Sequence, residues 1–318
     1  MSCEEDNEQE ELKTPICEIK NPQEGTTFTK GDIIEISVET VDNDNLLSEI
    51  RFYINNVGVA SVTSFPYTYS WQTGNKEFGI YLIKAKAVYE NETIAEDSVS
   101  IKLTNTGNTL TDYEGNTYKT VVIGNQEWMS ENLKVTSYND GTPIALETDN
   151  ENWNDLNTGA YCWYNNNSEN ADMYGALYNW YAVETDKLCP EGWHVPTDSE
   201  WKELEIFLGM TTLEADNHGQ RGTNEGSILA SNSDLWLEGN LINDKEFGIS
   251  GFNAFPAGRR GATDFDYLEE GGFFWSNTLE IDTQGELAWY RMLFYNTAKV
   301  DRQRSVKESG FSVRCVKD

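Results

Sequence analysis

The chain has 318 residues, which is enough for two domains that each bury a core of their own. Its formal net charge is -31, from 54 acidic and 23 basic residues. Such a chain repels phosphate backbones, so the charge excludes nucleic acid as a partner. Hydrophobic residues at 38%, with 12% aromatics, argue against a disordered chain.

The first residues form an acidic run, Met1 to Glu11, that lacks the apolar core of a signal peptide. The run resembles the start of a mature bacterial lipoprotein, in which a cysteine that follows a small residue carries lipid. Here Cys3 follows Ser2, and the acids after it resemble the signal that sends Bacteroidetes lipoproteins to the outer face of the outer membrane. This resemblance implies that residues 1–14 are a tether lipidated at Cys3. The alternative is a free cysteine in a solvated tail.

Residues 15–104 alternate apolar and polar side chains, with turn formers roughly every eight to twelve residues. This pattern predicts a small antiparallel β-sandwich of about seven strands. The segments Asn21-Pro-Gln-Glu-Gly25 and Pro66-Tyr-Thr-Tyr-Ser-Trp71 resemble those of bacterial immunoglobulin-like spacer domains. Asp42-Asn-Asp-Asn45 has the oxygen ligands that calcium prefers, but no further acid is spaced to complete a shell. A turn rich in Asx residues is therefore favoured there.

Small polar residues at 105–109 predict a linker, and residues 110–318 form the second domain. Helical spacing of apolar residues predicts a helix over 172–183. Thr197-Asp-Ser-Glu200 has the pattern of a capping box at the start of a second helix, which ends at Gly209. Residues 209–272 show no long periodicity and predict an irregular loop region. Apolar runs predict three closing strands, at 273–277, 287–295 and 310–316.

Several segments of the second domain occur in the order found in one bacterial family. They are Val122-Ile-Gly-Asn-Gln-Glu-Trp-Met, Gly159-Ala-Tyr-Cys-Trp-Tyr, Tyr174-Gly-Ala-Leu-Tyr-Asn-Trp-Tyr, Leu188-Cys-Pro-Glu-Gly-Trp-His-Val-Pro-Thr, Gly251-Phe-Asn-Ala-Phe-Pro-Ala-Gly-Arg259, Phe274-Trp-Ser-Asn277 and Gly310-Phe-Ser-Val-Arg-Cys315. The domain thus resembles the Fibrobacter succinogenes major paralogous domain, an extracellular module related to the C-type-lectin-like fold of formylglycine-generating enzymes. The resemblance implies an α+β, C-type-lectin-like domain behind the all-β immunoglobulin-like one.

Cysteine pairing depends on the same resemblance. With Cys3 acylated, four cysteines remain, and four cysteines allow three pairings. The resemblance implies a disulfide between Cys189 and Cys315, with Cys17 and Cys162 left as buried thiols. An exported location is an assumption of this disulfide.

The sequence offers little catalytic chemistry. Formylglycine-generating enzymes use a pair of cysteines near the C-terminus, where this chain has only Cys315. No HExxH, CxxC, P-loop or GxSxG motif occurs, and His194 is interpreted as a packed, hydrogen-bonded residue. Trp153-Asn154-Asp155 resembles a calcium-ligand tripeptide of sugar-binding lectins, but it lies before both predicted helices, so we interpret it as chance. We expect no enzyme activity, no metal and no cofactor.

A binding surface remains as the best hypothesis. Sugars stack on aromatic rings while polar side chains hold their hydroxyl groups, and residues 209–272 supply candidates of both kinds. The candidate ligand-binding residues are Trp236, Asn253, Arg259, Arg260, Asp264 and Tyr267. The alternative is that the two arginines form structural salt bridges and that Trp236 plugs the loop onto the core. Recognition here would not need calcium.

These features predict a non-catalytic binding or adhesion lipoprotein, anchored by lipid in the outer membrane and facing the exterior. Its partner would be a glycan or a surface protein. The alternatives are a structural component of a cell-surface complex and a degenerate enzyme.

Overall fold

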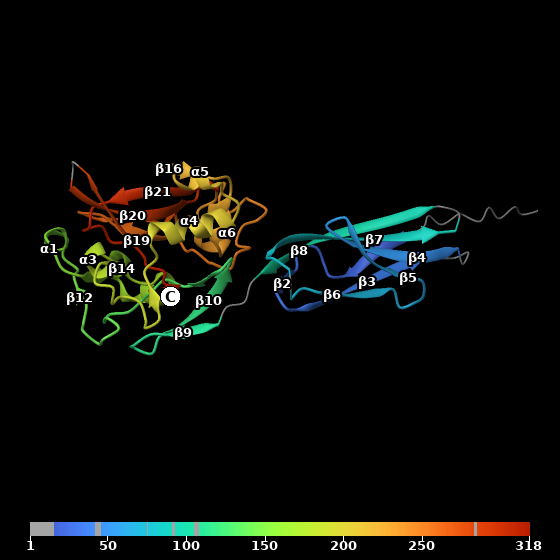
Figure 1. Ribbon diagram of the computed structural model, residues 1–318, viewed down its shortest axis with the longest axis horizontal. Helices are drawn as coiled ribbons and strands as arrows, with labels where there is room; N and C mark the ends of the chain where they lie inside the picture. The colour runs from blue at the N-terminus through green and yellow to red at the C-terminus, as the bar shows by residue number, and fades with distance from the viewer. Residues whose placement is uncertain (1–15, 42–45, 75, 91–92, 105–107, 283–284) are drawn as a thin grey trace, which may run out of the picture. The chain divides into compact units, whose positions relative to one another are not determined.

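The structure, a computed structural model, describes residues 16–41, 46–74, 76–90, 93–104, 108–282 and 285–318. The chain divides into two compact units, Met1–Thr104 and Asn105–Asp318, each with its own core (Figure 1). The lipidation expected at Cys3 and the turn expected at Asp42 to Asn45 lie outside the described residues.

No helix in the described ranges is long and apolar enough to cross a membrane.

The first unit is a sandwich of two β-sheets. One sheet has the strand order β1-β3-β6 and the other β2-β8-β7-β4-β5. The strands are β1 (Ile16–Asn21), β2 (Thr27–Thr29), β3 (Ile33–Val41), β4 (Leu47–Ile54), β5 (Val57–Val62), β6 (Thr68–Gln72), β7 (Gly79–Tyr89) and β8 (Ile94–Thr104). The predicted alternation is confirmed, because Ile34, Ile36, Phe52 and Trp71 point into the core. The short strand β2, parallel to β8, was not predicted.

The turn between β4 and β5 also follows from the sequence. Asn55 and Asn56 have φ values of 47° and 64°, in the left-handed region that asparagine tolerates better than most residues. Two such residues give the turn type whose twist matches that of a β-hairpin.

The second unit consists mainly of β-strands joined by short helices. Its strands are β9 (Thr109–Thr111), β10 (Thr117–Ile123), β11 (Gln126–Met129), β12 (Ala145–Leu146), β13 (Ala160–Cys162), β14 (Leu177–Tyr178), β15 (Trp193–His194), β16 (Gly219–Arg221), β17 (Ala257–Arg260), β18 (Phe265–Leu268), β19 (Gly271–Asp282), β20 (Gly285–Phe294), β21 (Val300–Ser305) and β22 (Val316–Lys317). Its α-helices are α1 (Asn150–Asn154), α2 (Ala171–Tyr174), α3 (Trp180–Val183), α4 (Asp198–Phe207), α5 (Thr212–Ala215) and α6 (Glu225–Leu229), and its 3-10 helices are η1 (Tyr164–Asn166), η2 (Ser168–Asn170) and η3 (Ser233–Leu235).

Three sheets organise this domain. The largest has the order β16-β21-β20-β19-β17-β18, a second has the order β15-β22-β11-β10-β9, and the third joins β12, β13 and β14. The two ends of the domain meet in the second sheet, where Trp128 of β11 pairs with Val316 of β22. The disulfide implied by the resemblance is present between Cys189 and Cys315 and closes the same region. Cys17 and Cys162 are buried and free, as expected.

Helix α4 packs on the six-stranded sheet through a buried ionic network. The predicted capping box is confirmed, since Thr197 and Glu200 exchange both hydrogen bonds. Two carboxylates of α4, Asp198 and Glu205, ion-pair with arginines of the sheet. Burial alone would raise the pKa of Asp198, but the arginines at 2.7 and 2.8 Å hold it well below its usual range.

The helix predicted over 172–183 is wrong. The segment contains two short helices, α2 and α3, separated by the strand β14. Gly175 breaks the helix, because its φ of 71° is left-handed and a Cβ there would lie 2.8 Å from the carbonyl oxygen of Leu133. Apolar spacing alone did not reveal this close approach of two backbones.

The region 209–272 is more ordered than predicted, since it contains α5, β16, α6, η3, β17 and β18. The closing strands also differ from the prediction. The first two are confirmed as β19 and β20. The next long strand is β21, which was not predicted because its sequence is rich in charged residues. Residues 310–316 are extended but pair through isolated bridges, with only Val316–Lys317 forming a strand.

His194 is held between two carboxylates, which gives the domain a pH dependence. Its Nδ1 lies 2.7 Å from Asp318 and its Nε2 lies 2.8 Å from Glu200 of the capping box. Partial burial lowers the pKa of His194, but these two carboxylates outweigh it and raise the pKa above its usual value of 6.5.

We therefore expect His194 to stabilise the fold fully below about pH 6.5 and to lose that contribution as the pH rises through its raised folded-state pKa. The change should be below about 1 kcal/mol, because all three side chains are partly exposed. Urea unfolding of the wild type and of His194→Gln between pH 5.5 and 9 measures it. A difference between the two proteins that stays constant with pH would contradict this expectation.

Candidate functional site

Two neighbouring arginines of β17 point to opposite faces of their sheet. Successive residues of a strand alternate in direction, so Arg259 and Arg260 cannot share one ligand. Arg260 is fully buried, whereas the side chain of Arg259 is 30% exposed. Each therefore needs its own interpretation.

Arg260 fixes helix α1 to the β17–β18 hairpin. Its guanidinium donates to the carbonyl oxygens of Glu147 and Asp149 and to Oδ1 of Asn150, at 2.6, 2.9 and 3.0 Å. It also stacks over the ring of Trp153, 4.2 Å from the centroid. Arg260 thus has the structural role that was the alternative prediction, although its partners are carbonyl oxygens rather than carboxylates.

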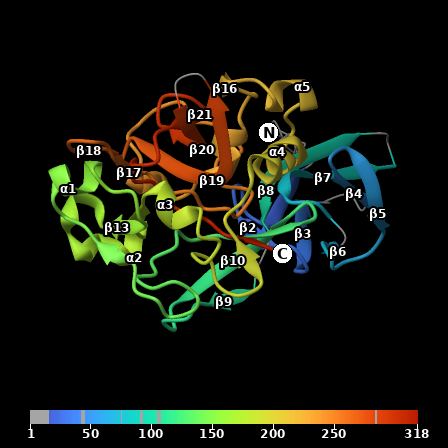
Figure 2. The same ribbon diagram turned by 60° about the vertical axis from the view of Figure 1, so that its left-hand side comes forward.

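An open cleft of about 340 Å³ lies between α1 and the turn that joins β17 to β18. Figure 2 shows α1 at the same end of the domain as these two strands. The lining residues are Asn150, Glu151, Asn154, Asp155, Ala262 and Thr263. Asn150 ties the two walls together, because its Nδ2 donates to the carbonyl oxygen of Thr263 at 2.7 Å.

The other polar side chains of the cleft are available to a ligand. Glu151, Asn154 and Asp155 are exposed, and within the described part of the chain none of their side-chain atoms takes part in a hydrogen bond or ion pair. Carboxylates accept hydrogen bonds, and an amide both donates and accepts. The cleft can therefore hold a small ligand that carries several hydroxyl or amide groups.

Helix α1 presents these groups from a rigid base. Trp153 is completely buried, and its indole NH donates to the carbonyl oxygen of Glu308 at 2.5 Å. Asp149 caps the helix by accepting from the backbone NH of Asn152 at 2.9 Å. Asn154 and Asp155 follow Trp153 directly, so their positions are fixed by its burial.

The predicted residues Arg259 and Tyr267 lie together on the opposite face of the sheet. The Arg259 guanidinium lies 4.9 Å from the centroid of the Tyr267 ring and 5.5 Å from that of Phe273. Its ion pair with Asp266 is long, at 3.5 Å. Tyr267 is 38% exposed and has a φ of 64°, which is unusual for a bulky side chain.

Trp236 is buried, which favours the alternative prediction over a ligand contact. Its side chain is only 5% exposed, and its indole NH donates to the carbonyl oxygen of Ser231 at 3.0 Å. Trp236 therefore fastens the loop to the core, as the alternative prediction held.

Asn253 and Asp264 have different hydrogen-bond partners. The backbone carbonyl of Asn253 accepts a hydrogen bond from the buried Arg314. Asp264 is exposed in the turn next to Thr263, where its carboxylate accepts the backbone NH of Phe265 at 2.8 Å. Of the six predicted residues, Arg260 and Asp264 adjoin the α1 cleft, and Arg259 and Tyr267 form the separate surface.

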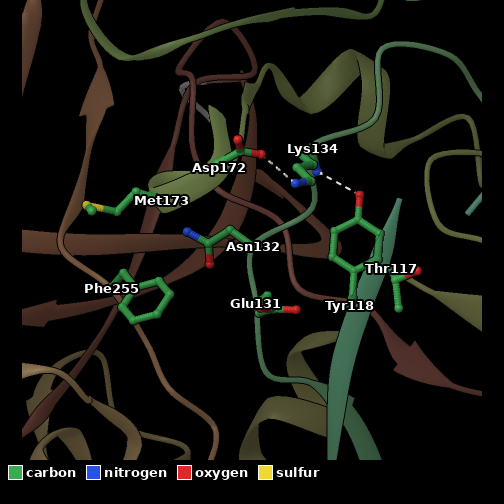
Figure 3. A pocket seen from close by; sticks show the side chains of 9 residues that line it. Thr117, Tyr118, Glu131, Asn132, Lys134, Asp172, Met173 and Phe255 are labelled. Atoms are coloured by element: carbon green, nitrogen blue, oxygen red, sulfur yellow. Dashed lines mark hydrogen bonds and ion pairs between the residues drawn. The ribbon is translucent and has the colours of Figure 1, made fainter. Parts of the chain in front are cut away.

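A second pocket, shown in Figure 3, is too small for a sugar ring. It measures about 50 Å³. Figure 3 shows the side-chain amine of Lys134 donating to Asp172 and the backbone NH of Lys134 donating to the Tyr118 hydroxyl. The remaining lining residues are Thr117, Glu131, Asn132, Met173, Gly175 and Phe255. A liquid water occupies about 30 Å³, so this pocket fits a few waters at most.

Sequence reasoning missed the side of the cleft formed by α1. It considers Trp153-Asn154-Asp155 only as a chance resemblance to a calcium-ligand tripeptide, and no group of metal-ligating side chains occurs among the described residues. The useful signal was the buried tryptophan followed at once by two polar residues, with the capping Asp149 before it. A short capped helix of this kind projects polar side chains from a fixed point.

The comparisons with known proteins agree with the two-domain architecture. A bacterial immunoglobulin domain matches residues 15–111, and the Fibrobacter succinogenes major domain matches residues 121–317. The chain is thus a two-domain protein with an immunoglobulin-like domain at its N-terminal side. Because the second match spans more than half of the chain, the chain belongs to the Fibrobacter succinogenes major domain family.

None of the curated proteins matches the chain. Among solved structures, fibronectin(III)-like modules of Clostridium thermocellum CbhA are 27% identical with a TM-score of 0.26, covering 28% of this chain and 94% of theirs. An endo-beta-1,4-mannanase from Thermotoga petrophila is 16% identical with a TM-score of 0.27, covering 31% of this chain and 22% of its own. Beta-glucuronidase 2 of Bacteroides uniformis is 8% identical with a TM-score of 0.24, covering 97% and 30%. Likenesses this low carry no argument about function.

Proposed function

We propose that this protein is a non-catalytic binding protein of the cell surface, and that the α1 cleft binds a glycan or a surface protein. The cleft carries this proposal. It joins a volume of about 340 Å³ to three exposed polar side chains on a rigid base. The amide and the two carboxylates can form hydrogen bonds with the hydroxyl groups of such a ligand.

The proposal includes the C-type-lectin-like fold for the second domain. In support, the pairing of β11 with β22 joins the two ends of the domain, and the disulfide closes them covalently. It also includes a lipid anchor at Cys3 in the outer membrane, on the resemblance of the N-terminal segment alone. The immunoglobulin-like domain would then act as a spacer between the membrane and the binding domain.

A glycan array probed with the full chain tests the binding function. We expect at least one glycan to bind, and Asn154→Ala to weaken that binding by about 1 to 2 kcal/mol, because it removes a side chain that can donate and accept. Asn152→Ala is the matched control, since Asn152 is an exposed asparagine of the same helix that does not line the cleft.

Two outcomes would contradict the proposed site. Equal loss of affinity in both variants would mean that α1 acts only through its stability. Loss of binding in EDTA would mean that a metal ion holds the ligand. The proposed site binds the ligand through side-chain hydrogen bonds and needs no metal ion. A chain that binds no glycan but is cross-linked to a protein at the cell surface would favour the protein ligand.

A further inference from the structure

One face of the six-stranded sheet brings together polar groups that the α1 cleft does not use. In the strand register, Phe273 of β19 pairs with Met292 of β20, and Met292 pairs with Asp301 of β21. Paired residues and alternate residues of a strand share a face, so Tyr290 lies on this face as well. The Arg259 guanidinium lies over the ring of Phe273 at 5.5 Å, which places it on the same face.

Two of these groups, Arg259 and Asp301, each have one buried atom without a hydrogen-bond partner among the described residues. The Nε of Arg259 and the Oδ1 of Asp301 are inaccessible to solvent and form no hydrogen bond with any residue that the structure describes. Asp301 is 92% buried, since its exposed fraction is 8%. Buried polar atoms in proteins are nearly always paired, so an unpaired donor and an unpaired acceptor on one face indicate a ligand or an ordered water.

The charges around Tyr290 support the same grouping. Burial raises its pKa to about 12, Arg259 lowers it, and Asp301 and Tyr267 raise it further. Both ionic groups therefore act on the Tyr290 hydroxyl. Among the described residues, this hydroxyl has no hydrogen-bond partner, so it too is available to a ligand.

We propose that Arg259, Tyr267, Tyr290 and Asp301 form a second ligand site, which takes an uncharged ring that carries hydroxyl groups. A hydroxyl group both donates and accepts, so one kind of group can pair with the partly exposed Arg259 guanidinium and with the Tyr290 hydroxyl. Asp266 and Asp301 would repel an anionic ligand, and Arg259 would repel a cationic one. The exposed ring of Tyr267 provides an apolar edge for such a ligand.

This site is independent of the proposed function of the α1 cleft. Arg259 and Arg260 project from opposite faces of β17, so a ligand at Arg259 does not contact the cleft that Arg260 supports. Failure of one site leaves the other untouched.

Ligand-observed NMR on the full chain tests this second site. The probes are methyl glucoside and methyl galactoside, with glucuronate and glucosamine as their anionic and cationic counterparts. We expect the uncharged glycosides to bind with millimolar dissociation constants and to bind more tightly than the charged sugars. Tyr290→Phe should weaken binding at least five-fold, and Arg259→Met at least ten-fold.

Two control variants test whether the glycosides bind at this face of the sheet. Arg304→Met removes an arginine of β21 that projects from the opposite face and stacks on Trp289, and it should leave binding unchanged. Asn152→Ala, which lies on helix α1 but does not line the cleft, should also leave it unchanged. The losses in Tyr290→Phe and Arg259→Met distinguish this site from the α1 cleft, because neither residue lines that cleft. Tyr290→Phe keeps the buried ring and removes only the hydroxyl group. It therefore still tests whether the glycosides bind at this face if Arg259→Met does not fold. Tighter binding of a charged sugar, unchanged binding in Tyr290→Phe, or no binding of either glycoside would overturn the proposal.

Discussion

Replacement of Glu205 by alanine should lower the free energy of unfolding of the second domain by about 3 to 5 kcal/mol. Glu205 is fully buried, and its carboxylate accepts hydrogen bonds from Arg221 at 2.8 and 3.0 Å and from Arg291 at 2.7 Å. Without Glu205, Arg221 loses its only carboxylate partner among the described residues, and Arg291 keeps only Asp198. Leaving a buried charge unpaired costs far more than the intact pair contributes.

Chemical denaturation measures this effect, and the same helix supplies the control. Glu203 is exposed on α4, so Glu203→Ala should change stability by no more than about 0.5 kcal/mol. Glu205→Gln keeps the size of the side chain and should fall between the two. If Glu205→Ala lowers the free energy of unfolding by less than about 1 kcal/mol, water must reach these arginines and solvate their charges.

Removing the disulfide should have a similarly large effect. Cys189 and Cys315 are 126 residues apart in sequence, so their bond restricts the unfolded chain over a long loop. In the chain-entropy model such a loop is worth about 4 to 5 kcal/mol. The double variant Cys189→Ser, Cys315→Ser should therefore melt about 10 to 20 °C lower in the second domain.

Calorimetry with and without reductant checks this result. Reductant should bring the wild type to the level of the double variant and should not change the variant itself. The transition of the immunoglobulin-like domain should stay where it is, because its only cysteine in the described ranges, Cys17, is free. A wild type whose melting temperature is unaffected by full reduction would contradict the chain-entropy estimate.

The first domain was largely predictable because its strands are local patterns. Alternation placed Ile34, Ile36 and Phe52 in the core without knowledge of their partners. The capping box at Thr197 was predictable for the same reason, since it involves only a few consecutive residues.

The parts that could not be predicted depend on contacts between distant segments. Gly175 breaks a helix because the backbone near Leu133 approaches it, and β21 is a strand because its charged residues Arg302 and Asp301 are buried against other elements. The α1 cleft likewise joins residues more than a hundred positions apart, Asn150 and Thr263, through the buried Arg260. Nothing in the local sequence near 150 indicates that partner.

The position of the bound ligand tests the proposed binding site most directly. A crystal structure of the full chain with a glycan selected on the array should show that glycan between α1 and the β17–β18 turn, with hydrogen bonds to Asn154 and Asp155. A glycan bound only on the immunoglobulin-like domain, or a cleft left empty beside a ligand bound elsewhere, would contradict the proposed site.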